Sequence, residues 1–502
     1  MLINSNQYKL PVPAMPFGVC CIASAVEKAG HDVKVLDLCF SNKCSSDIRK
    51  GIAEFQPDIV GISIRNIDTG ATYNTLFLLD EVKEKIVNPI KKSFSGPVVI
   101  GGPAIGISGS EILEYLDLDY AIKGDGEIAF TEYLTRIEKD LPLNGLSGLI
   151  WRRDGHLVED NPPARINTLN SLPFANHAKY LDLEKYRKFN SPLQIQTKRG
   201  CALKCAYCTY NMIEGPNVRF RDPKRIADEI ETMVKETGIK HIEFTDSTFN
   251  IPLNHAKAVL RAIIDKNLDL ELQTMGLNPG AIDEELAQLM KKANFKEAHV
   301  GVDSGCNSVL EALNKNFKKD DVIRAGKYLK EAGIPVMWYI LTGAPGETQE
   351  TLRETYETLQ MAASKWDLVI VGNGIRLYKD SPISKQVLKK NPNCTHDNFL
   401  HPAAYYPEKI SLSTLRILNK RAALQHPNFL FFDEVQRMPM IFLKIQTTLM
   451  RLLAPHKPWW KSYIFMNSVK KVLGIQALQS FLFSFKNRQV FSRLESRITS
   501  NA

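Results

Sequence analysis

The sequence lacks the long apolar segment and the leader that a membrane-spanning or exported protein would carry. No run of about 18 apolar residues occurs, so no transmembrane helix is predicted. The N-terminal stretch MLINSNQYKL does not combine a basic start with an apolar run, which argues against a secretory signal peptide. We therefore expect a cytoplasmic protein.

Cysteines suited to a disulfide framework are also lacking. The chain has nine cysteines, and an odd count in a long chain without an export signal argues against paired thiols. We interpret the six scattered cysteines as small buried apolar side chains. These are Cys20, Cys21, Cys39, Cys44, Cys306 and Cys394.

The main body of the chain has little excess charge of either sign. The net charge is +9, but residues 441–502 alone hold ten Lys or Arg and one Glu, a local net charge of +9. The first 440 residues are therefore close to neutral. Without a basic face on the main body, no nucleic-acid partner is expected.

Residues 1–144 alternate short apolar runs with helical patterns. This alternation is typical of a doubly wound parallel sheet, and ligands of such sheets bind beyond the carboxyl ends of the strands. Strands are predicted at 33–38, 59–64, 98–100 and 120–122, with helices at 18–29, 45–55 and 73–88. The candidate ligand-site residues after these strands are Arg65, Asn66, Asp68, Gly101, Gly102, Gly124 and Glu127.

Three further regions follow this first domain. Residues 145–192 are predicted to form a β-hairpin, which turns at Asp154-Gly155, and a linker that contains prolines. Residues 193–390 alternate again, and six strand–helix units predict a partial (β/α)6 barrel with its chemistry at the carboxyl ends of the strands. Residues 391–502 are predicted to be a helical, basic region. The barrel strands are expected at 193–197, 241–245, 270–274, 298–302, 336–341 and 368–371.

Three cysteines lie close together directly after the first barrel strand, as Cys201-Ala-Leu-Lys-Cys205-Ala-Tyr-Cys208. Three thiolates on one tight loop can hold three irons of a [4Fe–4S] cluster and leave the fourth iron open. A closed structural zinc site is the main alternative, but it needs four ligands, and no second Cys pair or nearby His supplies one. Chance clustering is the other alternative.

The cysteine spacing resembles the C-x3-C-x-aromatic-C signature of the radical S-adenosylmethionine (SAM) superfamily. Three later stretches resemble motifs of the same superfamily: Glu243 to Asn250, Gly301 to Gly305, and Thr342 to Thr348. The resemblance implies that the open iron chelates SAM and that an electron from the cluster cleaves SAM to a 5′-deoxyadenosyl radical. It implies SAM-binding roles for Tyr207, Asp246, Asp303, Ser304, Gly343 and Gly346. Packing of the cysteine loop is the alternative role for Tyr207, and strand-end capping is the alternative for Asp246 and Asp303.

Residues 1–144 resemble the cobalamin-binding domain that precedes many radical SAM enzymes. The matching stretches are Ala29 to Val33, Val99 to Pro103 and Gly124 to Glu127. The D-x-H-x-x-G loop whose histidine ligates cobalt in many cobalamin domains is absent from residues 1–144, which implies that no histidine of that loop holds the lower face of cobalt.

Arg65-Asn66-Ile67-Asp68 is similar to a stretch of the cobalamin radical SAM tryptophan C-methyltransferases. An arginine is a poor metal ligand, and near cobalt it would block coordination. The alternative is an Arg65–Asp68 ion pair that caps the next helix.

The resemblance favours a cobalamin-dependent methyltransferase that acts on an unactivated carbon of a small molecule or peptide. It also implies an external electron donor of the flavodoxin or ferredoxin kind. A rearrangement, ring contraction or oxidative cyclisation on the same cofactors is the second enzymatic hypothesis. A non-catalytic cobalamin or cluster sensor is a third, although no output domain is evident.

The basic tail, 441–502, carries apolar and aromatic runs flanked by Lys and Arg. Helices of this kind can lie in a membrane interface, which would make the protein peripheral at the inner face of the membrane. A helical cap that buries its apolar face against the barrel is the favoured alternative, and reception of an anionic substrate is the third.

Overall fold

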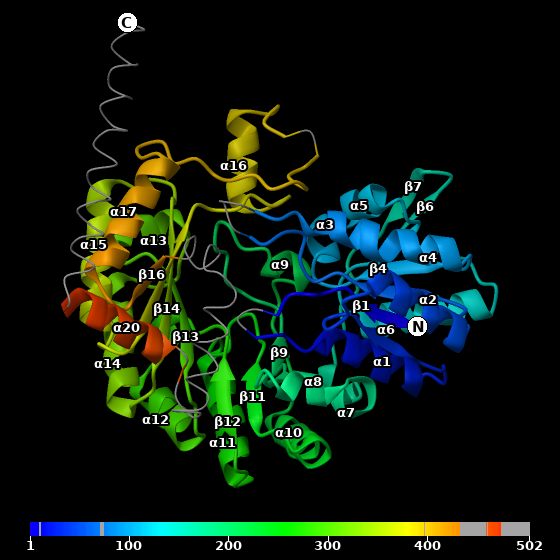
Figure 1. The fold of residues 1–502 in the computed structure, drawn as a ribbon, viewed down its shortest axis with the longest axis horizontal. Coiled ribbons are helices and arrows are strands. Elements are labelled where there is room, and N and C mark those ends of the chain that lie inside the picture. The colour runs from blue at the N-terminus through cyan, green and yellow to red at the C-terminus, as the bar shows by residue number, and fades with distance from the viewer. Residues whose placement is uncertain (10–11, 71–74, 396, 432–457, 459, 473–502) are drawn as a thin grey trace, which may run out of the picture.

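The computed structural model describes residues 1–9, 12–70, 75–395, 397–431, 458 and 460–472. Two α/β bodies lie side by side, with the N-terminal one in blue and cyan and the barrel-like one in green in Figure 1. The expected class, a Rossmann-like domain followed by a partial barrel and C-terminal helices, is confirmed.

The N-terminal body is built on a seven-stranded sheet with the order β2-β1-β3-β4-β5-β6-β7. Its first five strands are parallel, and β6 and β7 are antiparallel. The strands are β1 (Leu2–Asn4), β2 (Val35–Asp37), β3 (Val60–Ser63), β4 (Val98–Gly101), β5 (Tyr120–Ile122), β6 (Leu149–Arg153) and β7 (His156–Asp160). The hairpin expected to lie between domains therefore extends this sheet, because β6 pairs with β5.

Helices cover both faces of this sheet, as in a doubly wound fold. One core contains Val19, Ala23 and Val26 of α1 (Phe17–Lys28) with Ala129 and Phe130 of α6 (Gly126–Glu138). The other core lies under the remaining helices of this domain. These are α2 (Cys44–Phe55), α3 (Leu78–Val82), which continues through a π-helical turn (Lys83–Val87) into α4 (Asn88–Ser93), and α5 (Ile105–Leu116).

A connector leads to the second body through a 3-10 turn (Leu169–Ser171), α7 (His177–Tyr180) and α8 (Leu183–Arg187). The second body has seven parallel strands in two hydrogen-bonded groups, β12-β11-β8 and β13-β14-β15-β16. Single bridges between Leu272 and Phe295 and between Leu277 and Val300 join the groups. The strands are β8 (Leu193–Ile195), β11 (His241–Phe244), β12 (Glu271–Thr274), β13 (Ala298–Asp303), β14 (Val336–Thr342), β15 (Leu368–Asn373) and β16 (Phe429–Phe431).

All six predicted barrel strands are present, and β16 is a seventh that the helical prediction for 391–502 missed. Its pairing with β15, which the local sequence does not show, identifies it as a strand. The helices of this body are α10 (Pro223–Thr237), α11 (Leu253–Asp265), α12 (Glu284–Lys292), α13 (Asn307–Ala312), α14 (Lys319–Ala332), α15 (Gln349–Ala362), α16 (Pro382–Lys390) and α17 (Leu412–Gln425), with a 3-10 turn at Pro279–Ala281.

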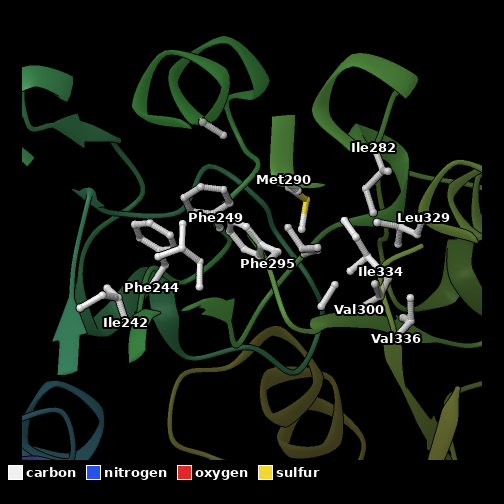
Figure 2. Packing of buried hydrophobic residues seen from close by; sticks show 14 of the residues in the cluster. Ile242, Phe244, Phe249, Ile282, Met290, Phe295, Val300, Leu329, Ile334 and Val336 are labelled. Carbon is white, nitrogen blue, oxygen red and sulfur yellow. The ribbon is translucent and has the colours of Figure 1, made fainter. Parts of the chain in front are cut away.

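Apolar side chains on one side of each barrel strand pack against the surrounding helices. Figure 2 shows Ile242, Phe244 and Val300 in this layer with Met290 and Leu329 from the helices. Since successive side chains of a strand point to opposite faces, the alternate positions of the same strands face the barrel lumen.

The last described helix, α20 (Trp460–Val472), packs against the barrel. Trp460 and Ile464 are buried with Met337, Leu368 and Leu430 of β14, β15 and β16. This part of the basic tail therefore forms a cap, whereas 441–457, 459 and 473–502 lie outside the described residues. Among the helices that the structure describes, none is long and apolar enough to cross a bilayer.

Candidate active site

The three motif cysteines lie on a loop that is closed at its base by two short strands. β9 (Lys198–Arg199) pairs antiparallel with β10 (Arg219–Phe220), and residues 200–218 between them are called the cysteine loop below. The loop turns tightly because the Cys201 N–H donates to the Gly215 carbonyl at 3.0 Å. Gly200 has φ +95°, and a Cβ there would lie 2.1 Å from the Asn217 oxygen, so the base of the loop requires glycine.

The loop carries three thiols, the ligand set that a [4Fe–4S] cluster with one open iron needs. Within the described ranges, no three His, Cys, Asp or Glu side chains are placed to hold one metal ion. In a cubane cluster each thiolate binds its own iron, so three thiols need not converge on one point. Burial raises the pKa of the Cys205 thiol and raises that of Cys208 to about 11, and iron binding would displace these protons.

A buried lysine that sequence reasoning missed lies beside the cysteines. Lys315 Nζ is 2.5 Å from Asp303 Oδ2 and 3.7 Å from Cys205 Sγ. The Tyr207 hydroxyl donates to the same Asp303 oxygen at 2.6 Å. Burial opposes the charge of Lys315, but Asp303 and Cys205 outweigh it and raise the pKa of the lysine. The predicted Tyr207 and Asp303 are thus brought together next to Cys205.

Asp246 and Ser304 are engaged within the protein. The Asp246 carboxylate accepts from the Thr197 amide at 2.7 Å and the Thr197 hydroxyl at 2.6 Å, which fastens the end of β8 to the end of β11. Ser304 Oγ lies 2.9 Å from Thr355 Oγ1 and accepts from the Cys306 amide at 3.1 Å. These bonds support the capping alternative for Asp246, and SAM contacts of either side chain stay predictions.

Gly343 and Gly346 belong to a turn after β14 that is held by one carboxylate. Both glycines have positive φ, +94° and +78°. Glu347 folds back so that its Oε2 accepts from the amides of Gly343, at 2.5 Å, and Ala344, at 3.1 Å. Burial raises the pKa of Glu347 to about 7. Gly346 is exposed and Gly343 is buried, and the SAM contacts of the two glycines stay predictions.

The lumen of the barrel holds a layer of polar side chains, one from each of five strands. They are Gln194, Glu243, Gln273, His299 and Tyr339, from β8, β11, β12, β13 and β14. Glu243 accepts from Gln194 at 3.0 Å and from Gln273 at 2.6 Å, and the Tyr339 hydroxyl is 3.3 Å from His299 Nδ1. Apart from Glu243, in the second SAM motif, no motif marked these residues, although their alternation with apolar neighbours was a usable signal.

The carboxyl edge of the N-terminal sheet has an open cleft. It is lined by Asn6 and Gln7 after β1 and by Arg65 and Asn66 after β3. In the strand order 2-1-3-4-5 this is the topological switch point, where doubly wound sheets bind their ligands. The one histidine of residues 1–144, His31, precedes β2 and so lies at the opposite edge. The lining residues of the cleft, which also include Leu78, Val82 and Ile86, contain no histidine, and this fits a cobalamin that the domain does not ligate through histidine.

Asp68 does not pair with Arg65. Its buried carboxylate accepts from Arg376 Nε at 2.8 Å and from the Gly70 amide at 2.7 Å. The alternative of an Arg65–Asp68 pair that caps the next helix is therefore wrong, and Arg65 and Asn66 are exposed at the edge of the sheet.

The predicted glycines of this domain serve close backbone packing. A Cβ at Gly102 would lie 2.6 Å from the Ile64 oxygen, and one at Gly124 would lie 2.2 Å from the Ala164 oxygen. A Cβ at Gly101 would lie 3.7 Å from the Ile122 oxygen, an ordinary contact. Glu127 is paired with Arg199 of the barrel domain. Contacts of Gly101, Gly102, Gly124 and Glu127 with cobalamin remain predictions.

The cysteine loop lies against the N-terminal domain. Its short helix α9 (Tyr210–Ile213) contacts α5, and a Cβ at Gly106 would lie 3.0 Å from Ile213 Cα. Figure 1 shows α9 between the two bodies. The site predicted for the cluster and the domain predicted for cobalamin therefore meet at one interface.

Comparisons with known proteins agree with this arrangement. The B12 binding domain model matches residues 9–134, and the Radical SAM superfamily model matches residues 195–359. An uncharacterized methyltransferase of Pyrococcus horikoshii is 26% identical over 75% of this chain and 80% of its own. The anaerobic magnesium-protoporphyrin IX monomethyl ester cyclase of Rubrivivax gelatinosus is 24% identical over 68% and 61%.

The structure of the radical SAM methyltransferase TsrM from Kitasatospora setae, solved with tryptophan and a SAM analogue, has a TM-score of 0.72 to this chain. It is 27% identical and aligns over 78% of this chain and 75% of its own. Another TsrM structure contains cobalamin and a [4Fe–4S] cluster. With both domain models matched in order and the cysteine loop docked on the cobalamin-type domain, this chain is an enzyme of the cobalamin-binding radical SAM family.

Proposed function

We propose that the protein is a cobalamin-dependent radical SAM methyltransferase that acts on an unactivated carbon. The observation that carries this proposal is the direct contact of the cysteine loop and its base with the N-terminal domain, which carries the predicted cobalamin site. A methyl group held by cobalamin and a substrate near SAM can meet only if the two cofactor sites share one interface. When bound, the cluster would supply an electron to SAM and cobalamin would carry the methyl group.

Oxidative cyclisation remains the second hypothesis, because a cyclase is among the relatives. The methyltransferase hypothesis is favoured because the alignments with the methyltransferases cover more of this chain and more of the relative than the alignment with the cyclase does.

The roles of the chain's own residues follow from their positions. Cys201, Cys205 and Cys208 would hold the cluster. Lys315 and Asp303 would present opposite charges beside it, suited to the carboxylate and ammonium groups of SAM. Arg65 would lie toward the lower face of cobalt, where its permanent charge cannot coordinate the metal.

The polar layer of the lumen is the proposed binding site of a small-molecule or peptide substrate. The interior of a complete (β/α) barrel is usually filled by branched apolar side chains, so five polar residues at this depth point to recognition. The electron would come from an external donor of the flavodoxin or ferredoxin kind.

The tail beyond α20 is the part for which membrane contact is still proposed. Flotation with anionic liposomes, with and without residues 473–502, tests it, because surface binding should need anionic lipid and weaken with salt. Equal flotation of the two proteins would exclude this segment as an anchor.

The function is tested with anaerobically reconstituted protein, cobalamin and SAM labelled in the methyl group. Label should pass from SAM to a product in an extract of the producing organism, and Cys205→Ala protein should transfer none. Cyclised product without label would favour the cyclase. Normal transfer by Cys205→Ala protein would overturn the cluster assignment.

A further inference from the structure

We propose that Asp125 and Glu127 of the N-terminal domain are positioning residues that hold the cysteine loop in its cluster-binding shape. They act through Arg199 and Arg219, the two arginines at the base of the loop. The proposal rests on the assignment of the cluster to this loop, and it gives the Gly124–Glu127 element a role beyond the expected cobalamin contact.

The first half of this connection is a forked ion pair across the domain boundary. Arg199 Nη1 donates to Glu127 Oε2 at 3.0 Å and to Asp125 Oδ1 at 3.2 Å, and Arg199 Nη2 pairs with Glu127 Oε1. The Arg199 side chain is 13% exposed, and those of Asp125 and Glu127 are 5% exposed. Bidentate pairs of this kind fix orientation as well as proximity.

The second half runs through Arg219. Its Nη1 pairs with Asp125 Oδ2 and donates to the Ile166 carbonyl at 2.8 Å, while Nη2 donates to the Glu214 carbonyl at 2.9 Å. Asp125 Oδ2 also accepts from the Ile166 amide at 2.7 Å. One aspartate thus ties the connector and both arginines together.

Both arginines act on the loop at short range. They face each other in the β9–β10 register, and Arg199 lies two residues before Cys201. The Glu214 carboxylate, on the residue whose carbonyl Arg219 holds, accepts from the Gly200 amide at 3.0 Å. Cys201 is in turn bonded to Gly215. A shift of either guanidinium therefore moves the backbone that carries the first ligand of the cluster.

Removal of one of these carboxylates should loosen the base of the cysteine loop, the β9–β10 pair. After loss of Glu127, Arg199 and Arg219 would share the single Asp125 carboxylate, and the simplest relief of this buried excess positive charge is movement of β9 toward water. Groups that orient metal ligands typically change metal affinity about 10- to 100-fold when they are lost.

The experiment compares Glu127→Gln with Glu111→Gln in the anaerobically reconstituted full chain. Glu111 also crosses the domain boundary, to Lys379, but does not contact the cysteine loop. Glu127→Gln should lose iron to a ferrous chelator about tenfold faster or more, and the paramagnetic resonance spectrum of its reduced cluster should change. Glu111→Gln should match the native protein in both measurements.

A second variant separates positioning from general stability. Glu127→Gln combined with Arg199→Gln removes the excess positive charge and leaves Arg219 paired with Asp125, so its melting temperature without iron should recover, while iron loss should stay fast. The proposal is overturned if iron loss by Glu127→Gln equals that of Glu111→Gln. It is also overturned if iron retention follows the melting temperature across the three variants. Retention of a full cluster by Cys205→Ala protein would instead refute the cluster assignment.

Discussion

At the scale of single residues, the chemistry of the site depends on charges placed where water is scarce. Lys315 contributes a buried ammonium between Asp303 and Cys205, and Glu347 contributes a buried carboxylate that organises the turn after β14. Lys315 could not be assigned by spacing, because its position depends on packing against the distant cysteine loop. Glu347 is held by amides only three and four positions earlier, and its burial is what the local sequence does not show. Each has a measurable consequence for stability or for the cofactor site.

Glu347→Gln should remove a pH-dependent cost to stability. The folded pKa, about 7, exceeds the usual value of 4.5, so the folded state binds more protons than the unfolded state between these values. Stability contributed by the neutral carboxyl is therefore lost as pH rises from about 4.5 to about 7. The variant should be more stable than the native protein above pH 7, by up to about 3 kcal/mol.

The measurement for Glu347 is urea unfolding across this pH range. Glu357→Gln, an exposed change on α15, the helix that follows this turn, should not alter the pH profile. Parallel profiles for native and Glu347→Gln protein would contradict the prediction.

Arg65→Ala should change the lower face of cobalt without removing the cofactor. No histidine of residues 1–144 lies at the carboxyl edge of the sheet, so the native Co(II) protein should show no nitrogen superhyperfine splitting in its paramagnetic resonance spectrum. With the arginine gone, water or imidazole can approach, and the optical spectrum should shift when imidazole is added. Nitrogen splitting in the native protein, or identical spectra for the two proteins, would be the contrary result.

At the scale of elements, the C-terminal helix α20 completes the barrel at its weakest edge. β16 has three residues, and Leu430 on it is covered by Trp460 and Ile464. The opposite side of α20 leaves Phe465 60% exposed. One helix therefore offers a buried and an exposed aromatic side chain for comparison.

Trp460→Ala should destabilise the protein by about 3–5 kcal/mol, because it leaves a cavity against β14, β15 and β16. Chemical unfolding followed by circular dichroism measures this loss. Phe465→Ala should cost less than about 0.5 kcal/mol, the usual limit for surface substitutions. Similar losses for the two variants would mean that α20 does not cap the barrel.

At the scale of the whole molecule, the domains are joined by buried charges at two separate places. Asp125 and Glu127 hold the cysteine loop, and Asp68 holds Arg376, which follows β15. Arg376 also donates to the carbonyls of Phe399 and Leu400, so the segment after α16 is tied to the loop after β3.

Asp68→Asn should cost about 3–5 kcal/mol, since it leaves the buried Arg376 without a counter-ion. Calorimetric unfolding provides the measurement. Asp117→Asn, which breaks an exposed pair with Lys91, should cost less than about 1 kcal/mol. A loss for Asp68→Asn no larger than that of the control would show that the pair does not hold the domains together.

Much of the fold was predictable from the sequence because its signals are local. The period of apolar residues predicted β8, β11, β12, β13, β14 and β15 within a few residues of their observed bounds. The short β1 and β16 were missed, because only their pairing with other strands, β1 with β2 and β3 and β16 with β15, identifies them as strands. The hairpin at 149–160 was predicted, but its pairing with the first sheet was not, because the local sequence does not show which strands pair with each other.

The sequence by itself determined the cysteine loop, because three ligands within eight positions need no distant partner to come together. It also determined the two domain types, because their motifs follow strand ends in a fixed order. Only the tertiary structure decided that Lys315 lies beside Cys205, that Asp68 pairs with Arg376 and that Glu127 pairs with Arg199. The physical reason is that a buried charge is tolerated only beside a partner, and tertiary packing, within the barrel domain and between the two domains, selects partners that lie 72 to 308 positions apart.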